Sequence, residues 1–140
     1  MARPASFRLP EDLLDRLDEE AADRRTSVTA LVAALLDEGL KTRRFPGIAY
    51  RDGPTGRRAG VVGGPDVWEI VAAIREAPGK GEQRLRRLAD QLGVPARWLH
   101  LAIDFYAAYP DEIDERIAAS ERVARTLRAE IARRERLLSR

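Results

Sequence analysis

The sequence predicts a mainly α-helical protein with short β-strands: a strand and two helices, then a β-hairpin with a helix-turn-helix, and finally one long helix. Three observations predict this class. The first nine residues alternate in polarity, several later segments carry apolar residues at helical spacing, and the last thirty residues contain neither glycine nor proline. The predicted organisation is a first domain over 1–42, a linker over 43–47, a second domain over 48–110 and a C-terminal helix over 111–140.

The composition excludes several classes of chemistry. The 140 residues contain no cysteine and a single histidine, His100, so disulfides, cysteine zinc sites and thiol nucleophiles are excluded. No paired acids, nucleophile with a base, or metal-ligand spacing is present, so we expect no enzyme, no catalytic residue, no cofactor and no metal. No apolar run is long enough for a membrane helix and no signal-peptide core is found, which predicts a cytoplasmic protein with no membrane contact.

The net charge is only +2, but basic residues cluster in two places. Residues 1–9 carry Arg3 and Arg8 without an acidic residue, and residues 41–58 carry six basic side chains against Asp52 alone. Nearly all the basic residues are arginine, whose planar fork suits phosphate. The same abundance of arginine and alanine is also typical of a GC-rich genome.

The first domain begins with a predicted strand over residues 4–9, which alternates with period two. Pro10 ends the strand and opens a helix. Ser27 is a good N-cap for a second helix, and Gly39 marks the predicted end of that helix. On the strand, Ala5, Phe7 and Leu9 would share one face, and Pro4, Ser6 and Arg8 the other.

A strand and two helices of about 42 residues are near the size at which a monomer lacks enough core. A lone strand also has unpaired backbone groups on both edges. Two copies would solve both problems by pairing their strands antiparallel and pooling their leucines into one core. Such a ribbon fits the major groove of DNA, with Ser6 and Arg8 of each chain outward and Arg3 beside them. The alternative is a strand that joins some other sheet, with a helical hairpin behind it.

The run Ser6-Phe7-Arg8-Leu9-Pro10-Glu11, the leucines of the first helix, and Arg25-Thr26-Ser27-Val28-Thr29 resemble the ribbon-helix-helix family of dimeric DNA-binding proteins. The resemblance covers residues 2–42. It implies a homodimer on double-stranded operator DNA whose outward strand residues read bases. It also implies that Thr26, Ser27 and Val28 donate backbone N–H groups to phosphate, which the helix dipole supports. Two positions depart from the family: Pro4 replaces a polar or basic residue, and Arg25 stands where glycine is common.

In the second domain, residues 48–51 and 57–62 flank a five-residue loop and predict a β-hairpin. A helix through Val67 to Ile74 follows, and the chain breaks at Pro78. Residues 85–103 have helix-turn-helix spacing, with Gly93 at the turn. The outward positions of its second helix suit base reading poorly, so packing without DNA contact is favoured. These positions are Ala96, Arg97, His100 and Asp104, while Trp68, Trp98, Phe105, Tyr106 and Tyr109 are expected in a core or an interface.

The stretches 53–59, 63–70, 92–95 and 107–114 resemble domain-of-unknown-function family four-three-three, a VapB-type antitoxin domain. The resemblance covers about residues 45–117. It implies a small hairpin and helix-turn-helix domain, often encoded beside a PIN-like ribonuclease toxin. The charged insert within 75–85 has no assigned role.

Residues 111–140 predict one helix about 45 Å long. Its apolar residues follow a 4-3 spacing that Ser120 and Arg134 interrupt. This pattern suits docking on a partner groove, and the alternative is a helix packed on its own domain or largely solvated. The antitoxin resemblance implies that this segment wraps the toxin, where an arginine would meet nuclease carboxylates.

Together these features predict a type II antitoxin that represses its own operon as a dimer and neutralises a PIN-like ribonuclease. The alternative is a stand-alone ribbon-helix-helix regulator without a toxin partner. A protein-only interaction module is a further class.

Overall fold

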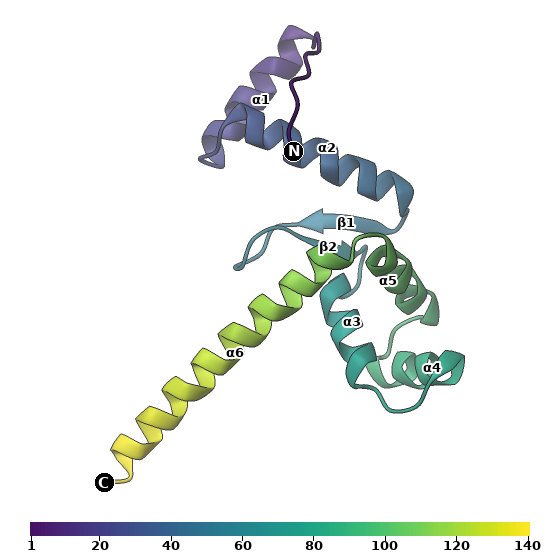
Figure 1. Cartoon of the computed structure of the whole chain (residues 1–140), viewed down its shortest axis with the longest axis vertical. Coiled ribbons are helices and arrows are strands. Elements are labelled where there is room, and N and C mark those ends of the chain that lie inside the picture. The colour runs from purple at the N-terminus through teal and green to yellow at the C-terminus, as the bar shows by residue number, and fades with distance from the viewer. The chain divides into compact units, whose positions relative to one another are not determined.

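A computed structural model describes residues 1–140 and divides them into two compact units, residues 1–44 and 45–140. The chain is mainly helical, with one small two-stranded antiparallel sheet (Figure 1), as the predicted fold class requires. None of its helices combines the length and apolarity needed to cross a bilayer. The elements are α1 (Glu11–Asp23), α2 (Val28–Arg44), β1 (Ile48–Arg51), β2 (Arg58–Val61), α3 (Val67–Glu76), α4 (Gly81–Leu92), α5 (Ala96–Ala108) and α6 (Pro110–Leu138).

In the N-terminal unit, a tight turn joins α1 to α2. The N–H of Thr26 donates to the carbonyl of Ala21 at 3.0 Å, which closes the end of α1 in a Schellman arrangement. Arg25 adopts the left-handed conformation that this motif needs, with a φ of 53°. Ser27 Oγ accepts from the N–H of Ala30 at 3.1 Å, which confirms the predicted N-cap of α2.

The core of this unit is small. Leu17 and Ala21 of α1 are buried against Leu31 of α2, and no other residue of the unit is fully buried. Leu13, Val28 and Val32 pack around them and stay partly exposed. The unit therefore buries little of the apolar surface that its helices carry.

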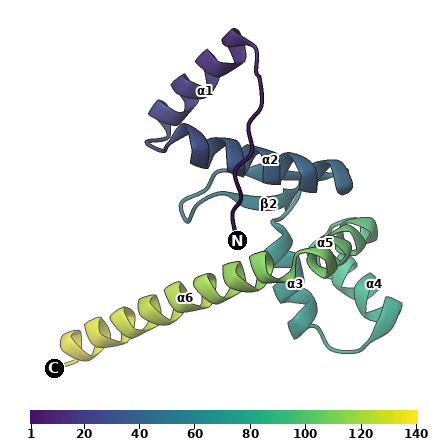
Figure 2. The ribbon, with the colours of Figure 1, turned by 45° about the horizontal axis from the view of Figure 1, so that its top comes forward.

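The strand predicted over residues 4–9 is not formed within the single chain. Residues 1–10 are exposed and have no secondary structure, and both views show them passing across α2 (Figures 1 and 2). The first backbone hydrogen bond after this segment runs from Leu14 to the carbonyl of Pro10. A strand needs a neighbouring strand for its backbone groups, and nothing within the unit supplies one.

The predicted end of the second helix is wrong. Gly39 lies inside α2, which continues through Arg44, so Arg43 and Arg44 are helical instead of part of a linker. Glycine costs only about 1 kcal/mol in a helix interior. The good helix formers Leu40 and Lys41 that follow it are enough to continue the helix.

The C-terminal unit is built around the hairpin and a helical layer. In the hairpin, Ile48 pairs with Val61 and Arg51 with Arg58. Helix α3 packs against α5, α6 and β2, and α4 joins α5 through Gly93, whose φ of 68° places it in the left-handed region. This glycine makes the predicted helix-turn-helix corner, since a side chain there would be strained.

One continuous apolar core fills this unit. Phe105, Leu99 and Ala102 of α5 have no exposed surface, and the ring of Phe105 contacts Phe45 and Tyr109 at centroid distances of 5.5 and 5.1 Å. This places Phe105 in the core, as predicted. The buried set is Ile48, Ala59, Val61, Val67, Ile70, Val71, Leu85, Leu88, Ala89, Leu99, Ala102, Phe105, Ile113 and Ile117.

Helix α6 is packed at its start and solvated beyond it. Ile113 and Ile117 are buried in the core, whereas Val123, Leu127 and Ile131 are 59%, 54% and 47% exposed. Pro110 occupies the first turn, where proline is favoured. The distal half of the helix projects away from the remainder of its unit (Figure 1).

Candidate nucleic-acid interface

The predicted base-reading residues lie on the exposed N-terminal segment. Arg3, Ser6 and Arg8 are all exposed, and no hydrogen bond or ion pair ties them to the rest of the chain. Phe7, between Ser6 and Arg8, is 77% exposed, and Leu9 is 38% exposed. The segment therefore presents both its polar and its apolar side chains to solvent.

The predicted phosphate-binding residues lie just before and at the start of α2. Thr26 and Ser27 are exposed and Val28 is partly buried. The N–H of Thr26 already donates to the carbonyl of Ala21 at 3.0 Å, so the prediction that this N–H binds phosphate is wrong for the single chain. Helix geometry leaves the first N–H groups of α2 without intrahelical acceptors, and Ser27 Oγ satisfies the one on Ala30. No acidic residue lies in this turn, so the positive end of the helix dipole is not neutralised there.

The structure does not join these two groups of residues into one site. No hydrogen bond or ion pair links the N-terminal segment to the start of α2. Both groups belong to the same unit and both are open to solvent, so either could meet a phosphate backbone from outside.

The basic patch over residues 41–58 is largely paired with carboxylates. Lys41 contacts Asp37 at 2.8 Å and Arg57 contacts Asp52 at 3.3 Å. Arg51 is bound to Asp66 at 2.7 Å. Because several of these basic side chains already contact a carboxylate within the chain, the patch offers less to DNA than its sequence indicates.

Asp66, which is only 3% exposed, is the centre of this pairing and was missed by the sequence analysis. Its Oδ1 accepts from Nε and Nη2 of Arg51 at 2.9 and 2.7 Å. Its Oδ2 accepts from Nε of Arg58 and from the indole N–H of Trp68, the latter at 3.2 Å. Burial raises the pKa of Asp66, but the hydrogen bonds and charges of the two arginines outweigh it, so the pKa lies below its ordinary value.

A signal for this site exists in the hairpin register. Arg51 and Arg58 lie directly opposite each other on β1 and β2, and two like charges in that position repel. A carboxylate between them resolves the repulsion, and Asp66, just before α3, provides it. The role of this cluster is to tie the hairpin to the start of α3.

Polar contacts also hold the base of α6. The hydroxyl of Tyr50 donates to Glu112 at 2.5 Å, and Arg75 on α3 donates to Asp114 at 2.5 Å. Tyr106 donates to the same carboxylate of Asp114 at 3.0 Å. The first two turns of α6 are therefore fixed to the hairpin, α3 and α5, which sets the direction of its exposed half.

On the outward face of α5, His100 contacts the neighbouring helix α4. His100 Nε2 lies 3.1 Å from a carboxylate oxygen of Glu82 on α4. No group of three or more histidine, cysteine or acidic side chains is placed to hold a metal. The contact links α4 and α5.

Comparison with known proteins adds no relative: no protein-family model, curated protein or solved structure matches this chain. The ribbon-helix-helix and VapB-type resemblances therefore stay predictions made on the residues quoted above.

Proposed function

We propose that this chain is a DNA-binding antitoxin that dimerises through its N-terminal unit, represses its own operon, and neutralises a PIN-like ribonuclease through α6. The observation that carries the proposal is the state of residues 4–9. This segment has an alternating sequence, exposed apolar residues Phe7 and Leu9, and backbone groups bonded to nothing else in the chain. A second copy of the segment, paired as an antiparallel ribbon, would cover the apolar side chains and give the backbone groups hydrogen-bond partners.

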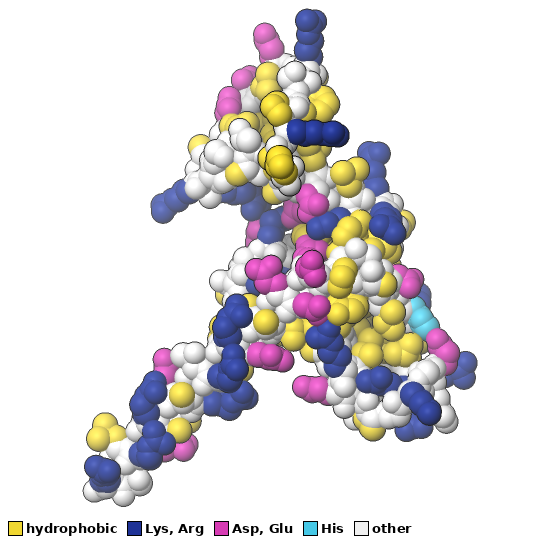
Figure 3. All heavy atoms as spheres, viewed as in Figure 1, with side chains coloured by type: hydrophobic (Ala, Val, Ile, Leu, Met, Phe, Trp, Pro, Cys, Tyr) yellow, Lys and Arg dark blue, Asp and Glu magenta, His cyan; other side chains and the backbone are white.

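The exposed apolar side chains of the N-terminal unit support a dimer. They lie on α1 and α2 as well as on the N-terminal segment, and Figure 3 shows hydrophobic side chains on the surface of this unit. A unit with so small a core gains most from covering such a surface. The exposed fractions are 42% for Leu14, 45% for Leu35, 55% for Leu36 and 71% for Leu40.

The polar side of the same segment supports DNA as the ligand. In a paired ribbon Ser6 and Arg8 would project from the face opposite Phe7 and Leu9. Arginine and serine are side chains that hydrogen-bond base edges in the major groove. The uncompensated start of α2 would add a phosphate contact beside the ribbon.

The exposed half of α6 supports a protein partner. Val123, Leu127 and Ile131 form an apolar stripe at helical spacing, and seven arginines against three glutamates surround it over residues 121–140. An acidic nuclease groove is complementary to this combination of apolar and positive side chains.

The ribbon is tested by measuring dimer formation and DNA binding on the full chain. Light scattering after size exclusion should give twice 15.7 kDa for the wild type and the monomer mass for Phe7→Asp. The matched control Leu92→Asp changes an exposed apolar residue in the other unit and should stay dimeric. A monomeric wild type at all concentrations would refute the proposal.

Base reading is tested by anisotropy titration of a fluorescent fragment of the gene's own promoter. The double variant Ser6→Ala with Arg8→Ala should lose about 1–3 kcal/mol for each lost base contact. Arg16→Ala removes an equal charge from α1 and should lose far less. Unchanged operator binding by the double variant would show that the ribbon does not read DNA.

The toxin part is tested by co-expressing the chain with the product of the adjacent gene. Leu127→Asp should prevent a stable complex, whereas Ala129→Asp, on the other side of the same helical turn, should not. If the wild type binds its operator but forms no such complex, the stand-alone regulator is the better description.

A further inference from the structure

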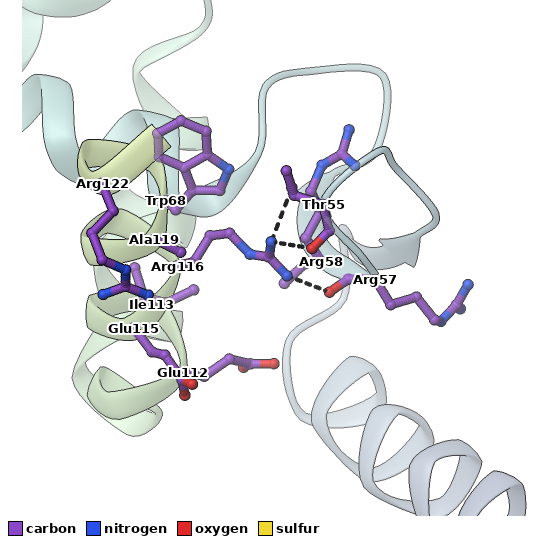
Figure 4. A pocket seen from close by; sticks show the side chains of 11 residues that line it. Thr55, Arg57, Arg58, Trp68, Glu112, Ile113, Glu115, Arg116, Ala119 and Arg122 are labelled. Carbon is purple, nitrogen blue, oxygen red and sulfur yellow. Dashed lines mark hydrogen bonds between the residues drawn. The ribbon is translucent and has the colours of Figure 1, made fainter. Parts of the chain in front are cut away.

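A cavity of about 420 Å³ lies in the C-terminal unit between the hairpin loop and the first turns of α6 (Figure 4). This volume falls in the range of small-molecule sites. Four arginines and two glutamates line it together with apolar and hydroxyl side chains. The lining residues are Thr55, Arg57, Arg58, Ala59, Trp68, Glu112, Ile113, Glu115, Arg116, Ala119 and Arg122.

Arg116 extends from α6 across this cavity to the hairpin loop, with Trp68 on one side and Glu112 and Glu115 on the other (Figure 4). Its Nη1 donates to the carbonyl and the hydroxyl of Thr55 at 2.7 and 3.0 Å, and its Nη2 donates to the carbonyl of Arg57 at 3.1 Å. All three acceptors are neutral, and no carboxylate forms an ion pair with it.

These contacts leave some N–H donors of Arg116 available to bind a ligand. A guanidinium has five N–H donors and three hydrogen bonds are made, so two N–H groups remain. Its positive charge forms no ion pair, although Glu112 and Glu115 lie on one side of it (Figure 4). Both features are satisfied by an oxyanion, and a carboxylate or phosphate can accept two N–H groups of one guanidinium at once.

Arg122 supplies a second positive charge at the same cavity. It is exposed, lies on α6 beyond Arg116, and makes no hydrogen bond or ion pair within the chain. Among the other charged residues of the lining, Arg57 contacts Asp52, Arg58 is bound to Asp66, and Glu112 accepts from the neutral hydroxyl of Tyr50. Glu115 is exposed and forms no ion pair. Of the arginines in the wall, Arg116 and Arg122 are therefore the two that form no ion pair with a carboxylate.

The rest of the wall is apolar and includes an indole. Ala59 and Ile113 are buried, and Trp68 and Ala119 are partly buried beside them. A flat ring gains burial and aromatic contact against such a wall. The lining thus combines a positive end with an apolar one.

We propose that this cavity binds a small organic oxyanion on a flat ring, with a carboxylate or a phosphate monoester held by Arg116 and Arg122 and the ring against Trp68. The site lies wholly within residues 45–140 and does not rest on the proposed DNA binding.

The experiment is calorimetric titration of the full chain with four probes: phenyl phosphate, benzoate, inorganic phosphate and the neutral benzamide. Ligands this small reach dissociation constants of about 1 mM. We expect phenyl phosphate or benzoate to bind and benzamide to bind at least about tenfold more weakly, because it offers no charge to the arginines. The stronger of the two anions shows whether the site prefers a phosphate or a carboxylate.

Location is tested with variants and with the indole N–H signal of Trp68, assigned by comparison with Trp98→Phe. Arg122→Gln should weaken binding about tenfold, whereas Arg133→Gln, an equal change farther along α6, should weaken it less than about twofold. Ala119→Phe fills the cavity and should abolish binding, while Ala129→Phe on the exposed helix should not. Arg122 and the control positions Arg133 and Ala129 are exposed, so we expect these substitutions to leave the fold intact.

The proposal is overturned if no probe shifts the Trp68 signal, if benzamide binds as well as benzoate, or if Arg122→Gln binds like the wild type. Equal binding of inorganic phosphate and phenyl phosphate would overturn the ring contact.

Discussion

The two units solve the problem of burying apolar surface in different ways. The C-terminal unit buries fourteen hydrophobic residues in one core, several of them without any exposed surface. The N-terminal unit buries three, and leaves Leu36 and Leu40 on α2 more than half exposed. Packing within the chain covers most of the apolar side chains in the first case and few of them in the second.

The difference shows that local sequence signals can form helices even where the unit does not bury their apolar faces in a core. Helices α1 and α2 have amphipathic sequences, a capped start at Ser27 and a closed end at Thr26, as complete as any in the C-terminal unit. What the N-terminal unit lacks is a second layer to bury their leucines. The following changes test this contrast, from the largest expected effect to the smallest.

Replacing the centre of the larger core should have the greatest effect. Phe105→Ala removes a fully buried ring and its contacts with Phe45 and Tyr109, and should lower the free energy of unfolding by about 3–5 kcal/mol. Urea unfolding followed by circular dichroism measures it. Val62→Ala, at a position 61% exposed, is the control and should cost far less. Equal costs for both variants would contradict the core assignment.

Removing the charge of Asp66 comes next. Asp66→Asn leaves Arg51 and Arg58 facing each other without a carboxylate, and should cost about 3 kcal/mol. The same urea experiment measures it, with the exposed Asp104→Asn as the control. A cost near zero would mean that the cluster does not fasten the hairpin to α3.

The same carboxylate predicts an acid dependence. Because the folded pKa of Asp66 lies below its ordinary value of 3.8, the unfolded chain binds its proton first. The stabilisation is therefore fully present above that value and is lost as the pH falls through the lower, folded pKa. The stability difference between wild type and Asp66→Asn should shrink on acidification, and a difference that grows would contradict this sign.

In the N-terminal unit, removal of the helix cap should have a smaller and local effect. Ser27→Ala leaves the N–H of Ala30 without its acceptor and should cost about 1 kcal/mol. Hydrogen exchange of the α2 amides in the full chain measures it. Ser139→Ala, at the end of α6, serves as the control, and equal protection of α2 in wild type and Ser27→Ala would disprove the role of the cap.

The smallest expected effect is an increase in stability. Arg25 has a left-handed backbone conformation, which glycine adopts without strain. Arg25→Gly should therefore raise the free energy of unfolding of the unit by about 0.5–1 kcal/mol. The adjacent Arg24→Gly is the opposite case, because Arg24 has ordinary helical geometry and contacts Glu20. It should destabilise, and a gain in both variants would point away from backbone strain.

Much of the local structure was predictable because its signals are local. Proline marks the beginnings of α1, α5 and α6, and the turn at Pro54-Thr55 lies within the predicted hairpin loop. Ser27 was predictable as a cap for the same reason. Gly39 misled the prediction because a single residue's propensity is weaker than that of the helix formers around it.

The remaining features depend on distant partners. Asp66 lies close to Arg51 and Arg58 only after the hairpin has turned and α3 has packed. The facing arginines were a signal in the hairpin register, but the burial of Asp66 between them was not visible in the sequence. Likewise, the cavity beside Arg116 exists because the base of α6 is fixed against the hairpin loop, 61 residues earlier. The strand predicted over residues 4–9 is not formed in the single chain, because residues 1–44 contain no neighbouring strand for it to pair with.

The projecting half of α6 has a thermodynamic consequence. Beyond Ile117 it is held by little besides hydrogen bonds along its own axis, and such helices lie close to the midpoint between helix and coil. Its last turns should therefore melt and re-form continually, with hydrogen exchange speeding up from Ser120 towards Ser139. A molecule that binds this half of α6 must offset the conformational entropy that the helix loses when it becomes ordered. Its affinity should therefore fall steeply as the temperature rises.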